Sequence, residues 1–451
     1  MPTIRAAFHT LGCKTNHYET DAIRRQFEQA GFATVPFEAF AEVYVINTCT
    51  VTGEAGRKSR QMLRRARKIN PSAVVVALGC HAELADDSDC ADITVGTAGK
   101  KRALGLVCQC LRERGLPVPD SAGRNGLIGL DGLDPATDGT RDDQYEEFGP
   151  VDRQSETRAY VKIEDGCNNF CSYCAIPLAR GRVRSRSRER ILEETAALAA
   201  AGYREIVLTG IHICSYGADR GQPSHAVMEL AGEMAAIEGL DRIRLGSLEP
   251  LSLTPRFIEL ARNNPKLLPH FHLSLQSGSD TVLARMNRRY RTPDYRTVVT
   301  LLRQAFDQPG LTTDVIVGFP GETETEHAAS LDFCAEMGFS RIHVFRYSSR
   351  QGTRAARMTD PVDPAIINRR SQEMLELAER LTLDFHRRQV GRKQVVLLEK
   401  LRPDGLFEGY TPEYVPVRVP AAPGLAEGQI VQVTGRAAER DFLLCHNAFA
   451  E

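Results

Sequence analysis

The feature that most constrains the fold is an alternation of short apolar segments and helical patterns, repeated six times from Ala159 onward. Such alternation predicts parallel strands joined by crossover helices, with functional residues at the carboxyl ends of the strands. We expect an α/β fold in which residues 151–388 form a partial (β/α)6 barrel, with a doubly wound sheet as the competing topology. The expected strands are Tyr160–Ile163, Glu205–Thr209, Arg242–Gly246, Phe271–Leu275, Asp314–Val317 and Arg341–Phe345.

The segments on either side of this region predict two further domains. Residues 1–116 show the same alternation and predict a small parallel sheet, with strands at Ile4–His9, Tyr44–Thr48, Val74–Leu78 and Ile93–Gly96 and helices at His17–Ala30 and Glu54–Ile69. Residues 117–150 are rich in Gly, Asp and Pro, which predicts a linker or insertion. Residues 389–451 predict a small antiparallel β-barrel or sandwich, with strands at Val395–Glu399, Leu406–Tyr410, Val415–Val419, Ile430–Thr434 and Phe442–Cys445.

Composition narrows the class of protein. Lys plus Arg number 57 and Asp plus Glu number 58, so a uniformly basic nucleic-acid binder is excluded, but local basic patches are not. No apolar run approaches the ~18 residues of a membrane span, and we expect a cytoplasmic protein. The 12 cysteines in 451 residues are too few for a disulfide scaffold, so metal or redox chemistry is the leading use of these thiols.

Three cysteines, Cys167, Cys171 and Cys174, lie in the sequence DGCNNFCSYCAIP, after the first expected barrel strand. Thiolates bind zinc or iron–sulfur clusters, but a structural zinc site needs four ligands, and no fourth Cys or His is near. The C-x3-C-x2-C spacing resembles that of the radical S-adenosylmethionine (SAM) enzymes. The resemblance implies a [4Fe-4S] cluster whose fourth iron binds SAM, and reductive cleavage of SAM to a 5′-deoxyadenosyl radical. A buried structural triplet is the alternative.

A second set of cysteines follows the strands of the N-terminal domain: Cys13 in GCKTN, Cys49 in NTC and Cys80 in GC. Because parallel strands end at one edge of a sheet, these thiols could converge there, or each could simply be a small packed side chain. Together with the radical SAM motif and a terminal barrel similar to a TRAM domain, these motifs resemble the methylthiotransferases over nearly the whole chain. The resemblance implies that Cys13, Cys49 and Cys80 hold an auxiliary [4Fe-4S] cluster.

The resemblance also implies a substrate. The sequences TLGCKTNHYETDAI and NNFCSYCAIPLARGRVRSR are most similar to the branch that adds a methylthio group at carbon two of threonylcarbamoyl-adenosine, next to the anticodon of tRNA. Thr15, His17, Ala175 and Leu178 depart from that pattern and put the branch in doubt. The implied partners are a tRNA anticodon stem-loop and an electron donor such as flavodoxin or ferredoxin. The alternatives are action on isopentenyl-adenosine, action on a ribosomal protein aspartate, and a non-catalytic iron–sulfur RNA-binding protein.

Several residues near the expected strand ends are candidates for SAM contacts. Tyr173 could stack on adenine or pack in the core, and the glycine at Gly210 allows a ligand close to the backbone. Ser247 and Glu249 suit ribose hydroxyls, or a helix N-cap, and Gln276 resembles a residue near the SAM adenine. Arg180 is the candidate for the SAM carboxylate.

Two basic runs predict RNA contacts. Six arginines occupy every second position from Arg180 to Arg190, which suits RNA phosphates better than the usual solvated charge run. Seven basic residues between Arg57 and Lys68 lie on the second expected helix, which could hold an anticodon stem or be an exposed helix face. The C-terminal barrel has seven basic and eight acidic residues from Gly391 onward, so charge does not mark it as an RNA anchor.

Overall fold

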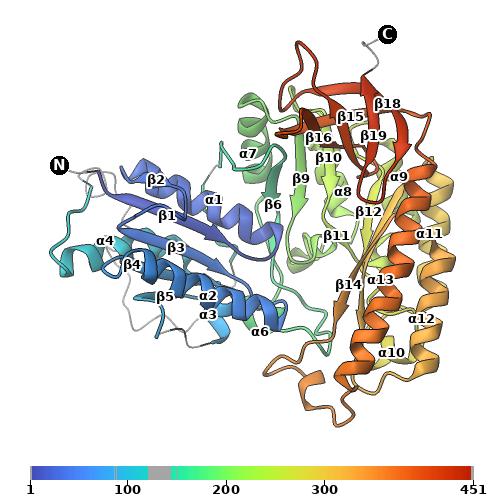
Figure 1. Cartoon of the computed structure of the whole chain (residues 1–451), viewed down its shortest axis with the longest axis horizontal. Coiled ribbons are helices and arrows are strands. Elements are labelled where there is room, and N and C mark those ends of the chain that lie inside the picture. The colour runs from blue at the N-terminus through green and yellow to red at the C-terminus, as the bar shows by residue number, and fades with distance from the viewer. Residues whose placement is uncertain (1–2, 86, 88, 120–143, 150, 448–451) are drawn as a thin grey trace.

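The computed structural model describes residues 3–85, 87, 89–119, 144–149 and 151–447. It contains an N-terminal α/β sheet, a central set of parallel strands surrounded by helices, and a C-terminal barrel (Figure 1). Most of the predicted linker 117–150 lies outside the described residues.

The N-terminal sheet is parallel, with the strand order β2-β1-β3-β4-β5. Strands β3 and β4 are buried along their whole length, because helices cover both faces of this sheet. The sequence predicted four of the five strands and two of the helices. The strands are β1 (Arg5–Thr10), β2 (Ala33–Val35), β3 (Val43–Thr48), β4 (Val74–Gly79) and β5 (Ile93–Val95), and the helices are α1 (Lys14–Gln29), α2 (Gly53–Ile69), α3 (Cys80–Leu84) and α4 (Ala103–Glu113).

The central region confirms the partial barrel and excludes the doubly wound alternative. Its main strands are β6 (Ala159–Lys162), β9 (Glu205–Thr209), β10 (Arg242–Leu245), β12 (His270–Leu273), β13 (Gly310–Val317) and β14 (Arg341–Arg346). They lie in chain order in two parallel sheets, β10-β9-β6 and β11-β12-β13-β14, linked by a bridge between Ile243 and Leu267. Among the described residues β6 does not pair with β14, so the barrel stays open along one side.

Helices and short strands complete this region. Their apolar faces form one core with the strands, which includes Phe257, Phe271 and Tyr295. The short strands are β7 (Glu164–Asp165), β8 (Arg184–Ser185) and β11 (Ser247–Leu248). The helices are α6 (Ile176–Arg180), α7 (Arg188–Ala200), α8 (Ala226–Met234), α9 (Pro255–Asn263), α10 (Asp280–Arg285), α11 (Thr292–Ala305), α12 (Glu324–Met337) and α13 (Pro364–Arg387).

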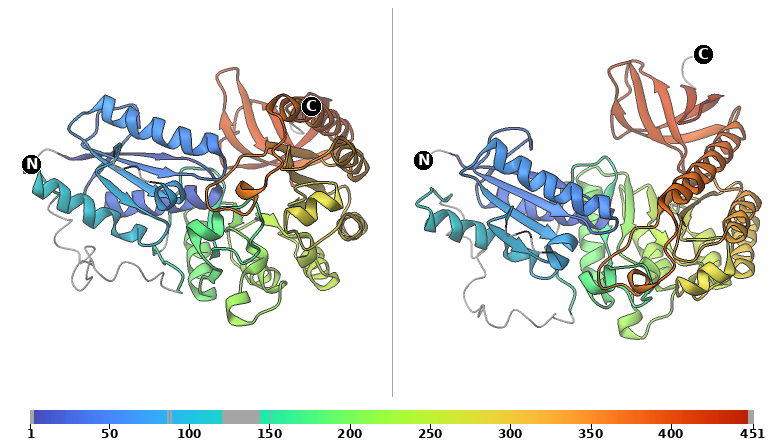
Figure 2. Two further views of the ribbon diagram at one scale, coloured as in Figure 1. Left: turned by 90° about the horizontal axis from the view of Figure 1, so that it is seen from below. Right: turned by 60° about the horizontal axis from the view of Figure 1, so that its bottom comes forward.

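The C-terminal strands close into a barrel in the order β15-β16-β17-β19-β18, so the sandwich alternative is wrong. The expectation of a purely antiparallel barrel also needs correction, because β17 and β19 pair in parallel. Helix α13 leads into this barrel, which stands apart from the N-terminal sheet (Figure 2). The strands are β15 (Lys393–Leu401), β16 (Leu406–Tyr410), β17 (Pro416–Pro420), β18 (Ile430–Ala438) and β19 (Leu443–Asn447).

Candidate active site

The first cysteine triad lies on the loop that follows β7. Gly166 enters this loop at φ +83°, and a Cβ there would lie 2.0 Å from the carbonyl oxygen of Arg182, so only glycine fits. Burial, together with the charges of neighbouring thiols of the triad, raises the pKa of Cys167 to about 11 and that of Cys174 to about 12. These thiols are close enough to interact, and they need a cationic partner to exist as thiolates. This donor set fits an iron–sulfur cluster.

Arg288 lies against this triad, and no sequence motif pointed to it. Its Nη1 donates to the Cys171 Sγ at 3.2 Å, and its Nη2 donates to the Glu249 carboxylate at 2.7 Å. Its Nε donates to the Tyr290 hydroxyl at 3.1 Å. Arg288 follows α10 in an irregular segment, so neither strand position nor spacing marks it. Glu249, which the sequence predicted as a SAM contact, is therefore connected to the cysteine loop through the buried side chain of Arg288.

A buried carboxyl group next to the triad was also missed. Glu164 is fully buried, and burial raises its pKa to about 8. Its Oε1 accepts the backbone N–H of His212 at 2.5 Å, whereas its Oε2 has no partner among the described residues. A Cβ on the predicted residue Gly210 would lie 2.2 Å from that Oε1, so this glycine makes room for the carboxyl group. An unpartnered buried carboxyl oxygen fits a positively charged ligand such as the amino group of SAM.

The structure places the remaining candidates for SAM contacts in different surroundings. Tyr173 packs against the apolar cluster of Met286 and Phe319. Ser247 is exposed on β11, and Gln276 follows β12 with φ +69°, a conformation that is rare for a residue other than glycine. Strained backbone of this kind is typical of functional sites. Their contacts with SAM stay predictions.

Arg180 is not placed as predicted. It is fully buried and donates to Glu19 at 2.8 Å, to Asp165 at 3.0 Å and to the Asn16 side chain at 2.8 Å. Its Nε lies 3.2 Å from the Cys80 Sγ. With every guanidinium nitrogen engaged, Arg180 has no free donor for a SAM carboxylate. It instead connects the barrel with the N-terminal sheet.

The second triad converges at one edge of the N-terminal sheet. Cys49 and Cys80 directly follow β3 and β4, and Cys13 lies three residues after the end of β1; these three strands are neighbours in the sheet. A Cβ built on Gly12 would lie 2.6 Å from the Cys49 Sγ, so the chain before Cys13 passes close to that thiol. Burial raises the pKa of Cys49 to about 11, and the charges of Cys13 and Cys80 add to this shift. The three thiols are therefore close enough for their charges to interact.

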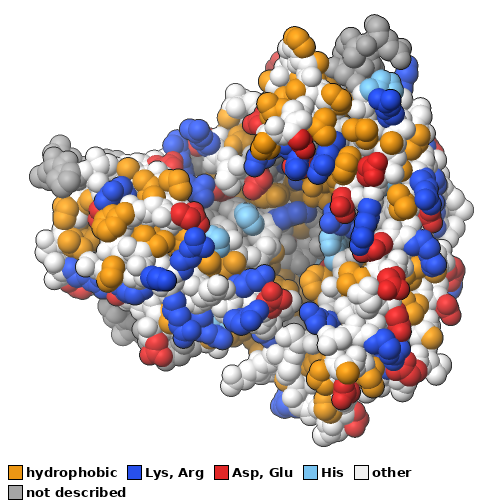
Figure 3. Space-filling view, viewed as in Figure 1, with side chains coloured by type: hydrophobic (Ala, Val, Ile, Leu, Met, Phe, Trp, Pro, Cys, Tyr) orange, Lys and Arg blue, Asp and Glu red, His pale blue; other side chains and the backbone are white. Residues whose placement is uncertain are grey.

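One segment after β14 contacts the surroundings of both triads. The Ser348 Oγ accepts the backbone N–H of Gly53, close to Cys49, at 3.0 Å. The backbone N–H of Ala355 donates to the carbonyl oxygen of Ser172, between Cys171 and Cys174, at 2.8 Å. Both triads therefore lie near this segment. A hollow between the domains is lined by cationic and histidine side chains (Figure 3).

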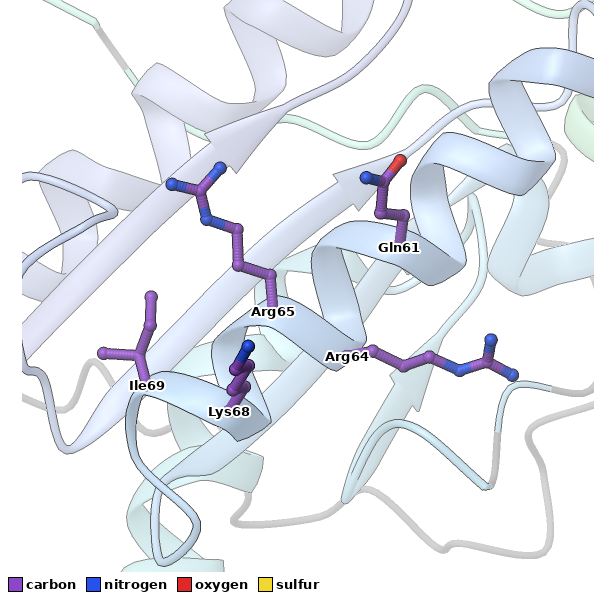
Figure 4. Close-up of a pocket in the computed structure, with 5 residues that line it drawn as sticks. All are labelled: Gln61, Arg64, Arg65, Lys68 and Ile69. Carbon is purple, nitrogen blue, oxygen red and sulfur yellow. The ribbon is translucent and has the colours of Figure 1, made fainter.

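The two basic runs differ in accessibility. Arg186 is fully buried against Glu147 and Glu194, and Arg188 pairs with Glu233. Since Arg180 is also buried, the prediction that this run binds RNA phosphates is wrong for Arg180 and Arg186, whereas Arg182 and Arg190 are exposed and Arg188 is partly exposed. Helix α2, in contrast, projects its basic side chains outward (Figure 4). Its exposed basic residues are Arg57, Lys58, Arg60, Arg64, Arg65 and Lys68.

The fold and the cysteine loop define a radical SAM protein. Residues 161–334 match the radical SAM superfamily, and residues 5–95 match an uncharacterized protein family, UPF0004. A radical SAM methyltransferase, TsrM from Kitasatospora setae, shares the fold with a TM-score of 0.53 over 76% of this chain and 73% of that chain, at 15% identity. Among the described residues, no helix is both long and apolar enough to cross a membrane.

Curated relatives specify the family. The threonylcarbamoyladenosine tRNA methylthiotransferase MtaB of Bacillus subtilis is 40% identical over 91% of this chain and 89% of its own length. MtaB of Thermotoga maritima is 35% identical over 92% of this chain and 91% of its own length. A tRNA-2-methylthio-N(6)-dimethylallyladenosine synthase of Carboxydothermus hydrogenoformans is 34% identical over 86% of this chain and 87% of its own length. The chain belongs to the radical SAM tRNA methylthiotransferases.

Proposed function

We propose that this enzyme inserts a methylthio group at carbon two of threonylcarbamoyl-adenosine, next to the anticodon of tRNA. The observation that carries the proposal is the pair of cysteine triads, each with three thiols, in two domains that Arg180 links through Cys80 and Asp165. Three thiolates leave one iron of a [4Fe-4S] cluster open, which a purely structural cluster does not need. This argues against a non-catalytic iron–sulfur protein.

Two cofactor sites would be formed by separate sets of residues. Cys167, Cys171 and Cys174 would hold the cluster that, with SAM bound, supplies a radical able to remove the inert hydrogen at carbon two. Glu164 would accept the SAM amino group, and Arg288 would hold Glu249 beside the cluster loop.

At the second site, Cys13, Cys49 and Cys80 would hold an auxiliary [4Fe-4S] cluster that carries the sulfur. The Arg180 guanidinium would support this site through its contact with Cys80. Cys49 and Cys80 are buried, whereas Cys13 is exposed, so a substrate would approach this site from the side of Cys13.

The choice of branch rests on the relatives. Relatives named MtaB reach 40% identity, whereas relatives named dimethylallyladenosine synthases reach 34%. The isopentenyl-adenosine branch is therefore less favoured, and no observation favours a ribosomal protein aspartate. The partners would be a tRNA anticodon stem-loop, contacted by helix α2, and a flavodoxin or ferredoxin as electron donor. With a tRNA substrate, the enzyme would act in the cytoplasm.

Nucleoside analysis of tRNA tests the proposal. A strain that lacks the gene should lose methylthiolated threonylcarbamoyl-adenosine and accumulate the unmodified threonylcarbamoyl nucleoside. The wild-type gene should restore the modification, and Cys167→Ala and Cys49→Ala variants should not. Persistence of the nucleoside in the deletion strain, or loss of methylthiolated isopentenyl-adenosine instead, would show that the branch is assigned wrongly.

A further inference from the structure

An aromatic side chain lies exposed on the loop that carries the first cysteine triad. Phe170, directly before Cys171, is 45% exposed, and Asn168 is the other exposed residue of the loop 166–175. The backbone of Phe170 has φ +48°, a conformation that is rare for a large side chain and costs conformational energy. The Asn287 side chain holds it there, because its Nδ2 donates to the carbonyl oxygen of Phe170 at 3.0 Å. The loop therefore presents an aromatic ring to solvent next to a cluster ligand.

Two exposed arginines flank this ring. The guanidinium carbon of Arg182 lies 5.3 Å from the centre of the Phe170 ring, which is a cation–π contact. Arg289 lies two residues after Asn287. Among the residues that the structure describes, neither guanidinium pairs with a carboxylate, whereas Arg186, in the same run as Arg182, pairs with two. Phe170, Arg182, Asn287 and Arg289 are called the cluster-loop patch below.

The two segments that form the cluster-loop patch are positively charged throughout. Residues 166–188 and 281–293 contain arginines but no Asp or Glu. Exposed aromatic and arginine side chains are enriched in protein–protein interfaces, and a surface of one charge attracts a partner of the opposite charge. The patch also lies close to the cluster site, since Arg288, the neighbour of Arg289, donates to the Cys171 Sγ at 3.2 Å. It therefore fits an acidic protein that must come close to this cluster.

We propose that the cluster-loop patch docks the electron donor, a small acidic protein that carries its electron on a flavin. The inference rests on the proposed function, which requires an electron from outside the chain. The exposed Phe170 ring can stack on the planar ring system of a flavin, and the two arginines attract acidic side chains around it. One electron leaves the reduced flavin and takes the cluster held by the first triad from its 2+ to its 1+ state, and no atom moves with it. An RNA partner is less favoured here, because helix α2 already offers tRNA an exposed basic face.

Two reductants separate docking from the chemistry of the cluster. Release of 5′-deoxyadenosine from SAM by the cluster-loaded enzyme, without tRNA, is measured with dithionite, which needs no docking site, or with flavodoxin kept reduced by its reductase and NADPH. Phe170→Asn removes the ring but suits the loop, since Asn tolerates a positive φ. Arg182→Gln removes one charge. Each variant should lower the rate at limiting flavodoxin about ten-fold and leave the rate with dithionite unchanged.

A matched control and the salt dependence complete the experiment. Arg256→Gln, which changes an exposed arginine of α9 paired with Glu259, should alter neither rate. Added salt should slow the flavodoxin reaction of the wild-type enzyme more than that of Arg182→Gln.

Three results would overturn the inference. They are a wild-type enzyme that flavodoxin cannot reduce, variants that keep the full flavodoxin rate, including any that only bind tRNA more weakly, and variants that lose the dithionite rate equally. If the wild-type enzyme cleaves SAM with both reductants but does not methylthiolate tRNA, the proposed function fails instead.

Discussion

At the scale of single residues, the cysteines were predictable and their charged neighbours were not. Cys167, Cys171 and Cys174 are separated by short fixed intervals, and Cys13 and Cys49 follow strands that the apolar pattern reveals. Arg180, Arg288 and Glu164 take their roles from residues far away in the chain. Local sequence carries no signal for such contacts, and so Arg180 was assigned to the wrong ligand.

The buried network around Arg180 leads to a prediction on stability. Arg180→Met removes the buried ion pairs with Glu19 and Asp165 and a link between two domains, although Lys162 still pairs with both carboxylates, so we expect a loss of about 3 kcal/mol, the lower end of the range for a broken buried pair. The midpoint of urea unfolding, followed by circular dichroism, measures this. Arg188→Met, in the same run but on the surface, should cost less than about 1 kcal/mol. Equal effects would contradict the structure.

Glu164 gives a prediction on pH dependence. Burial raises its pKa from 4.5 to about 8, so between these values the folded protein keeps a proton that the unfolded chain releases. The free energy of unfolding should therefore fall as pH rises across this interval. Thermal unfolding without SAM should show this fall, and Glu164→Gln, which cannot ionise, should reduce it. An identical pH profile in the variant would refute the raised pKa.

At the scale of secondary structure, apolar periodicity located most strands within a few residues. β9 and β16 have the predicted bounds, because turn residues delimit both. β13 begins at Gly310, four residues before the predicted start. The apolar pattern did not reveal its first residues because Thr312 and Thr313 are polar; both are buried, and their hydroxyl groups are hydrogen-bonded. The parallel pairing of β17 with β19 depends on the closure of the whole barrel, which no local pattern encodes.

Helix α2 provides a prediction on RNA binding. Its exposed basic side chains can each release a counterion when they bind a phosphate. Replacing Arg60, Arg64 and Lys68 by Gln should weaken tRNA binding at least about ten-fold. The slope of the logarithm of the binding constant against the logarithm of the salt concentration should become shallower by about 0.9 for each lost phosphate contact. Cleavage of SAM without RNA should not change. Arg296→Gln, an exposed control paired with Glu336, should bind tRNA normally. An unchanged salt dependence in the triple variant would exclude α2 from the interface.

At the scale of the whole molecule, the sequence predicted the order of the parts but not their arrangement. Contacts such as that of Tyr18 with Glu194, at 3.1 Å, join residues 176 positions apart. Lys162 of β6 reaches Glu19 of α1 at 2.7 Å, which fixes the N-terminal sheet against the open barrel. These contacts hold together the two domains that carry the cysteine triads, and neither motif alone indicates them.

The proposed methylthio transfer requires two separate clusters in one chain, and a measurement of the iron content tests this requirement most directly. Anaerobically reconstituted wild-type protein should bind about eight iron ions per chain. The triple variant Cys13→Ala, Cys49→Ala, Cys80→Ala should bind about four and still cleave SAM, whereas the triple variant Cys167→Ala, Cys171→Ala, Cys174→Ala should bind about four and not cleave SAM. Unchanged iron content in either variant would contradict the account.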